Sequence, residues 1–116
     1  LAGAGALRST ARDMLDFLAA NMGLIETPLL KAMKSSHERR NDAGSSRMAI
    51  GLAWHIRGSG ENTIIWHNGG TGGYRSFAGF IPRQKRGIVI LTNSSHDNPD
   101  DLGMHWLDPK IPLRNR

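Results

Sequence analysis

Nine residues, from Trp66 to Tyr74, hold the greatest concentration of groups that could bind or transform a small molecule. They combine a histidine, an asparagine and a threonine with four glycines. Histidine titrates near neutral pH and can accept or donate a proton. Glycine in a strand usually marks a bulge or a place where another molecule approaches the backbone. The segment is therefore a candidate site, with a plain hairpin loop as the alternative.

Four other kinds of site fit this segment poorly. A phosphate-binding loop or a dinucleotide fingerprint requires a helix after the glycines, whereas Tyr74 to Phe80 is predicted to be a strand. No Gly-x-Ser-x-Gly nucleophile elbow occurs. The chain has no cysteine and its five histidines match no zinc pattern, so we predict no metal site and no cofactor. These histidines are His37, His55, His67, His96 and His105.

The overall composition disfavours a nucleic-acid-binding or membrane-spanning protein. The 116 residues carry a formal net charge of +5, which could attract nucleic acid. However, the basic residues are scattered, and aromatic residues do not alternate with them as single-strand binding requires. No apolar run approaches the roughly 18 residues that span a bilayer, and the N-terminus does not resemble a signal peptide.

Two helices are predicted before the glycine-rich segment and one after it. Thr10 and Asp13 form a capping-box-like pair at the start of the first helix, and Gly23 ends it. The second helix begins with Pro28 at its first position, and the third is entered through Asn98. The predicted helices cover about residues 10–22, 28–34 and 99–107.

Four strands are predicted between the second and third helices. Runs of β-branched and aromatic residues define them, and turn clusters such as Gly58 to Asn62 separate them. The polar stretch from Ser35 to Arg47 is predicted to be a loop. Short connections favour an antiparallel meander, and helices packed on one face of it would make an α+β fold. The predicted strands cover about residues 48–57, 63–67, 74–81 and 87–92.

Residues His67 to Tyr74 have the form His-x-Gly-x-Thr-Gly-Gly-Tyr. This form resembles the third motif of penicillin-recognising serine hydrolases, in which a Lys-Thr-Gly triplet lies at the active-site cleft. Histidine often replaces the lysine in the branch of class C β-lactamases, D-alanyl-D-alanine peptidases and esterases. Ala4 to Asp13 is similar to the family's Gly-Gly-Leu-x-Ser-Thr-Ala-x-Asp stretch, and Ile50 to Trp54 to its Gly-Leu-Gly-Trp strand. The resemblance covers nearly the whole chain.

The resemblance implies a partial β-lactamase/transpeptidase-like fold and a role for each motif residue. The motif strand would pair with the acyl-amide backbone of a small-molecule substrate, which His67, Asn68, Gly69, Gly70 and Thr71 would contact. Gly69 would permit close approach, and the Gly70 amide would be one of two oxyanion-hole donors, worth about 3 kcal/mol in the transition state. His67 would polarise the nucleophile's network or contact substrate; a structural hydrogen bond is the alternative.

The chain contains no nucleophile of the type that this family uses. The family's Ser-x-x-Lys motif requires a serine three residues before a lysine, and none of the four lysines has one. The single tyrosine, Tyr74, is followed by Arg75 and Ser76, so Tyr-x-Asn is also absent. Without a nucleophile and its base, we expect the chain to be inactive alone. We expect residues 1–116, which begin without methionine, to be the C-terminal segment of a longer hydrolase's α/β domain.

The expected activity of that longer protein is hydrolysis of a β-lactam, a D-Ala-D-Ala peptide or an ester through an acyl-enzyme. A non-catalytic module used for association is the first alternative, and a basic nucleic-acid-binding domain is the second. A chain that lacks part of its core is expected to pair with the missing N-terminal portion, or to form a homo-oligomer or domain swap. Family members are commonly extracytoplasmic, so the resemblance implies a periplasmic or secreted location.

Overall fold

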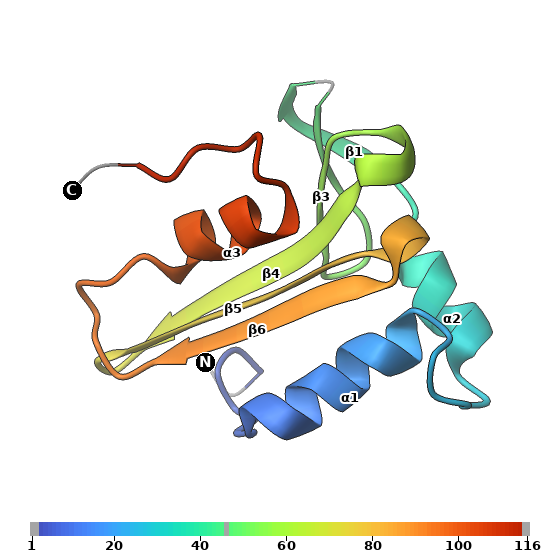
Figure 1. Ribbon diagram of the computed structural model, residues 1–116. Coiled ribbons are helices and arrows are strands. Elements are labelled where there is room, and N and C mark those ends of the chain that lie inside the picture. The colour runs from blue at the N-terminus through green and yellow to red at the C-terminus, as the bar shows by residue number, and fades with distance from the viewer. Residues whose placement is uncertain (1–2, 46, 115–116) are drawn as a thin grey trace.

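The computed structural model describes residues 3–45 and 47–114, which form three α-helices and six strands (Figure 1). The strands make one antiparallel sheet in which each strand pairs with the next in sequence. The predicted α+β class with an antiparallel meander is therefore confirmed. The elements are α1 (Ala11–Asn21), α2 (Leu30–Ser36), β1 (Asn41–Ser45), β2 (Met48–Ile50), β3 (His55–Arg57), β4 (Ile64–Thr71), β5 (Tyr74–Ile81), β6 (Arg86–Thr92) and α3 (Pro99–Leu107).

Helices α1 and α3 cover opposite faces of the sheet (Figure 1). This corrects the expectation that the helices share one face. Both faces of the central strands carry buried apolar side chains, so each face needs its own cover. The cluster on the α1 face contains Leu18, Met22, Ala49, Ile56, Ile65 and Phe80. The cluster on the α3 face contains Ile64, Phe77, Ile81, Met104 and Leu107.

The helix ends follow the capping residues of the sequence. The side chain of Thr10 accepts a hydrogen bond from the Asp13 amide at 3.1 Å, and α1 begins one residue later. The side chain of Asn98 accepts from the Asp100 amide in the same way, so α3 starts at Pro99. Helix α2 begins at Leu30 instead of residue 28, because the Thr27 hydroxyl accepts from the Leu29 amide and holds a turn there.

The sheet has six strands where the sequence predicted about four. The predicted strand 48–57 reverses direction: the Gly51 amide donates to the Trp54 carbonyl at 2.9 Å, and Ala53 has a φ of 66°. That turn separates β2 from β3. Strand β1 lies inside the predicted loop 35–47 and pairs with β2 in an irregular register. Its sequence, Asn-Asp-Ala-Gly-Ser, has none of the β-branched residues that signal a strand.

Strand β4 continues four residues beyond the predicted end at His67. Gly69 and Gly70 stay in register with Ser76 and Arg75 of β5. The turn between β4 and β5 consists of Gly72 and Gly73 alone, both with positive φ, as two-residue hairpins require. The glycine-rich motif is therefore mostly strand, and only its last two glycines form the loop.

Strand β6 has an open edge. It pairs with β5 on one side, and no strand of the described residues pairs with it on the other. Ile88, Val89 and Ile90 are half-buried along it. Such an edge is a ready template for another strand. No described helix is long and apolar enough to cross a membrane.

Candidate functional site

The motif residues lie where β4 loses one of its two neighbours. Strand β3 pairs only with Ile64 to Trp66, whereas β5 pairs with β4 as far as Thr71. Residues 67–71 are thus paired on one side only among the described strands. In an antiparallel ladder, the backbone N–H and C=O groups of successive residues point alternately to the two neighbouring strands. The Trp54 carbonyl accepts from the Gly51 amide on the β2 side, so the backbone groups of His55, the next residue, point to β4. The amide and carbonyl groups of Asn68 and Gly70 therefore point outward along this free edge.

The His67 side chain is exposed and sits at the free edge. Its Nδ1 lies 2.5 Å from the carbonyl oxygen of Asn68. The ring of His55 lies beside it, with centroids 5.1 Å apart, and stacks on Trp66 at 4.7 Å. Burial and the neighbouring His67 lower the pKa of His55, and Asp100 partly offsets this. Three aromatic rings thus line the approach to the motif from the β3 side.

Asn68 points to the α3 face and joins the motif to that helix. Its Nδ2 donates to Oδ2 of Asp100, in the first turn of α3, at 2.6 Å. The other carboxylate oxygen, Oδ1, is buried without a hydrogen-bond partner among the described residues, as is Nε1 of Trp66. The side chain of Asn68 thus donates the hydrogen bond that holds the Asp100 carboxylate. The bond fixes the motif strand from its far face.

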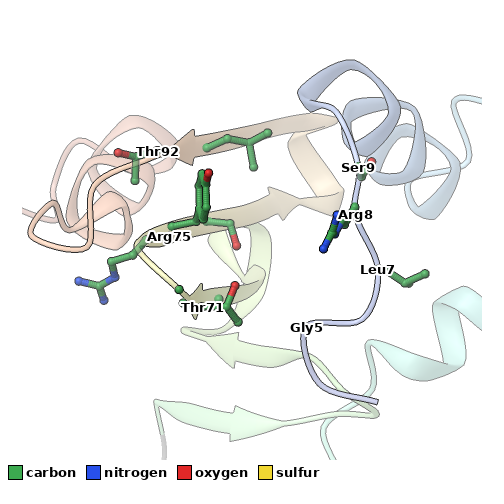
Figure 2. A pocket seen from close by; sticks show the side chains of 13 residues that line it. Gly5, Leu7, Arg8, Ser9, Thr71, Arg75 and Thr92 are labelled. Atoms are coloured by element: carbon green, nitrogen blue, oxygen red, sulfur yellow. The ribbon is translucent and has the colours of Figure 1, made fainter. Parts of the chain in front are cut away.

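A groove of about 700 Å³ opens on the α1 face of the same strand. One wall is the N-terminal segment 5–9, and the other is formed by residues 69–72 with the adjoining ends of β5 and β6 (Figure 2). The segment comes so close to the motif that a Cβ on Gly5 would lie 3.0 Å from the Thr71 methyl carbon. Gly5 also has a φ of 75°, which favours glycine.

Sequence reasoning found part of this site. Gly69, Gly70 and Thr71 line the groove, whereas His67 stands at the free edge and Asn68 on the opposite face. Segment 5–9 and Asp100 were not anticipated as neighbours of the motif. The resemblance of residues 4–13 to a family segment could have indicated that segment 5–9 lies near the motif. Nothing in the sequence indicated that Asp100 does. The described residues contain no group of three or more His, Cys, Asp or Glu that could hold a metal ion.

His37 belongs to the core and lies away from the motif. Its Nε2 lies 2.8 Å from Oδ1 of Asn21, whose Nδ2 donates to the Phe17 carbonyl, so the ring nitrogen is the donor. Its ring meets Phe80 edge-on at 5.0 Å. Burial, assisted by Lys34, lowers the pKa of His37 to about 4. His37 is therefore neutral at physiological pH and stabilises the packing of the α1 face.

The structure resembles solved members of the penicillin-recognising group. One is the octameric penicillin-binding protein homologue from Pyrococcus abyssi, with a TM-score of 0.76 and 22% identity over 89% of this chain and 24% of that chain. Another is a class C β-lactamase, with a TM-score of 0.72 and 20% identity over 93% of this chain and 37% of that chain. At these identities the likeness establishes the fold.

Sequence comparison gives the same family. The β-lactamase of Psychrobacter immobilis is 25% identical over 81% of this chain and 31% of its own length. That of Yersinia enterocolitica is 29% identical over 80% of this chain and 33% of its own length. The chain thus spans about a third of the length of these curated relatives. A model of the family described as Beta-lactamase matches residues 1–111, and the chain belongs to that family.

Proposed function

We propose that this chain is the C-terminal segment of the α/β domain of a serine hydrolase that forms and hydrolyses an acyl-enzyme. Its substrate would be a β-lactam, a D-Ala-D-Ala peptide or an ester. The chain supplies one wall of the active site, and the rest of a longer protein supplies the Ser-x-x-Lys nucleophile. Membership of the β-lactamase family and the partial coverage of its relatives support this division.

The free edge of β4 is the observation that carries the proposal. A substrate amide laid along residues 67–71 would find the outward-facing groups of Asn68 and Gly70, as an added strand does. The outward N–H of Gly70 is aimed where a carbonyl oxygen of such a substrate would lie, so it serves as one oxyanion donor. Gly69 and Thr71 direct their backbone groups inward to β5 and instead border the groove.

His67 acts at the end of this edge. Its ring is exposed and lies at the carbonyl of Asn68, so it can contact the substrate or polarise the nucleophile's network without leaving the strand. An imidazole ring carries two nitrogens that can take part in hydrogen bonds. We expect His67→Ala in the longer protein to lower kcat/KM by about 10²-fold, as loss of a proton-transfer or polarising group does.

The sharpest test removes one N–H. In the longer protein, Gly70→Pro deletes the outward amide, while the inward ladder bonds of the neighbouring residues remain. Gly70→Ala is the matched control, because its Cβ would meet nothing closer than 3.9 Å and the amide is kept. We expect Gly70→Pro to lower kcat on a chromogenic cephalosporin or a p-nitrophenyl ester by about 10²–10³-fold, and Gly70→Ala to change it little.

The same assays on the 116-residue chain alone should give no turnover above buffer. Turnover by this chain alone would show that the nucleophile has been assigned to the wrong part of the protein. A longer protein in which Gly70→Pro and Gly70→Ala behave alike would show that the Gly70 amide is not an oxyanion donor.

The open edge of β6 and the exposed side of α1 support an additional partner surface. Leu15 and Phe17 of α1 are 46% and 44% exposed, and Leu7 just before the helix is 96% exposed. Apolar groups left open in this way mark places where more chain packs. We propose that the N-terminal portion of the same protein covers them, and that without it a second copy does. Sedimentation of the chain alone against the chain mixed with that portion tests this: loss of self-association on mixing is expected.

A further inference from the structure

Four rings form a continuous column that runs from the core of the α3 face to the free edge of β4. Phe77 is fully buried, and the Trp66 ring stacks on it with centroids 5.9 Å apart. His55 stacks on Trp66 at 4.7 Å, and the exposed His67 ring lies 5.1 Å from His55. The position of an exposed ring is therefore tied, ring by ring, to a buried one.

The inner end of this ring column is held firmly. A Cβ on Gly103 of α3 would clash with the Phe77 ring, and one on Gly79 would lie 2.8 Å from it. The two glycines thus let the backbone pack directly against Phe77. Nε1 of Trp66 is buried without a hydrogen-bond partner among the described residues, so packing orients the indole. His55 is therefore stacked on a ring whose place is set by the core.

Two contacts orient the His67 ring in the described part of the chain. Its Nδ1 bonds to the Asn68 carbonyl oxygen, and the ring itself lies against His55. A carbonyl oxygen only accepts hydrogen bonds, so Nδ1 carries a proton whenever this bond is formed. Nε2 is then the nitrogen that gains or loses a proton. One exposed hydrogen bond between adjacent residues contributes little alone, so the contact with His55 is needed to keep the ring in place.

His55 makes this contact through packing and not through charge. The charged groups that act on it are His67 of β4 and Asp100 of α3. Burial and His67 lower the pKa of His55, and Asp100 raises it by less. His55 is therefore mostly neutral at physiological pH, so it lies against His67 without repelling it.

We propose that His55 is a positioning residue that holds the His67 ring on the Asn68 carbonyl, so that Nδ1 stays protonated and Nε2 meets the substrate or the nucleophile's network. This inference rests on the proposed function and deepens it by assigning the working atom of His67. His55 belongs to β3, outside the motif, and acts through His67 alone.

The tautomer of His67 can be read from its ring nitrogens by NMR on the 116-residue chain with ¹⁵N-labelled histidine. Once the ring is neutral, we expect a single tautomer with a protonated Nδ1 and an unprotonated Nε2. His55→Phe keeps a ring that can stack on Trp66, so it should preserve that tautomer. His55→Ala removes the ring and should give a mixture. His96→Ala, at an exposed histidine after β6, is the matched control and should also preserve it. The amide spectra show whether each variant is folded.

Kinetics of the longer protein give the second readout. His55→Ala should lower kcat on a p-nitrophenyl ester about tenfold, because the His67 ring then holds its working position for only part of the time. KM should change less than about twofold, since ground-state binding to the strand edge remains. His55→Phe should recover most of kcat, and His96→Ala should match the unaltered protein. Loss of packing alone would lower stability without this division between kcat and KM.

A mixture of tautomers in the unaltered chain would overturn the inference, whatever the variants do. A mixture in His55→Phe, or a single tautomer in His55→Ala, would overturn it as well. The proposed function fails separately. If Gly70→Pro leaves turnover intact while the tautomers respond as expected, His55 positions His67 but the catalytic role is wrong. If turnover depends on Gly70 and His67 while His55→Ala keeps both the tautomer and kcat, only this inference is wrong.

Discussion

The two halves of strand β4 differ in almost every physical respect. Ile64 to Trp66 pair with β3 on one side, Ile65 pairs with β5 on the other, and Ile64 and Ile65 are 1% and 2% exposed in the two core clusters. His67 to Thr71 pair with β5 alone among the described strands, and their side chains are small or exposed except that of Asn68, which is half-buried against Asp100. One half is a fixed strand with dense packing on both faces. The other is an extended backbone open to an incoming molecule.

This difference shows how the fold positions a site that has few contacts of its own. The motif half has little apolar surface to bury, so its position depends on the packed half and on β5. Substitutions of residues that pack on the packed half should therefore lower the stability more than substitutions in or beside the motif half. Four measurements test that separation.

The largest effect is expected at Phe80 of β5, which pairs with Ile65 of the packed half, is fully buried on the α1 face and lies 5.4 Å from the Trp54 ring. Phe80→Ala should lower the free energy of unfolding by about 3–5 kcal/mol, because it leaves a cavity opposite Ile65. Tyr74→Ala, at a residue of β5 that pairs with Thr71 of the open half and is 63% exposed, should lower it by less than about 1 kcal/mol. Urea unfolding followed by circular dichroism measures both. Equal losses would remove the distinction between the two halves.

A smaller effect is expected where the open half is tied to α3. Asn68→Ala removes the hydrogen bond to Oδ2 of Asp100. Because Oδ1 has no hydrogen-bond partner among the described residues, the carboxylate then loses its side-chain donor. We expect a loss of about 1–2 kcal/mol, reduced because the pair is partly exposed to water. Asp100→Ala and the double variant complete a thermodynamic cycle. Additive losses would show that the two side chains do not interact.

A pH-dependent loss of stability is expected from His37, whose ring packs on Phe80 beside the packed half. Its pKa in the folded protein, about 4, is below the value of about 6.5 in the unfolded chain. Between these values the unfolded chain binds more protons, so the free energy of unfolding falls as the pH falls from about 6.5 to about 4. The half-exposed ring limits the contribution to on the order of 1 kcal/mol.

His37→Gln can still donate to Asn21 but does not titrate. Urea midpoints measured between pH 7 and pH 4 should therefore fall less for His37→Gln than for the unaltered chain, while other titrating groups act equally on both. Parallel curves would show that the His37 ring titrates alike in the folded and unfolded states.

The smallest effect is expected at two neighbouring glycines of the motif. A Cβ on Gly69 would lie 2.8 Å from the Ser76 hydroxyl oxygen, whereas one on Gly70 would meet nothing closer than 3.9 Å. Gly69→Ala should destabilise the protein by about 0.5–1 kcal/mol, since the serine side chain can rotate away. Ser76→Ala should restore that loss, and Gly70→Ala should be neutral. A loss that Ser76→Ala does not restore would place the strain in the backbone.

The sequence predicted the elements that carry strong local signals. Helix α3 and the start of α1 follow from their capping residues, Asn98 and Thr10. Strands β5 and β6 follow from their apolar runs. Strand β1 was missed because its pairing with β2, and not its composition, makes it a strand. The reversal between β2 and β3 depends on a positive φ at Ala53. Alanine rarely adopts such a φ, so its presence in the sequence does not predict a turn.

The motif residues could be identified from the sequence, but their surroundings could not. The bond from Asn68 to Asp100 joins residues 32 positions apart, and the groove needs segment 5–9 to fold back on β4. Such contacts result from sheet register and helix placement, which local patterns do not encode. The predicted end of the strand at residue 67 was too early for a related reason, since cross-strand pairing with β5 keeps Gly69 and Gly70 extended.

The two-glycine turn at Gly72 and Gly73 restricts how this family segment can change during evolution. Side chains alternate between faces along β4, so one residue inserted or deleted between His67 and Tyr74 would slip the pairing with β5. A slip of one position would carry Gly69 to the α3 face and Asn68 to the groove. A substitution at a motif position leaves this pairing register unchanged. An insertion or deletion changes the register, so the number of residues between His67 and Tyr74 is more strongly constrained than their identities.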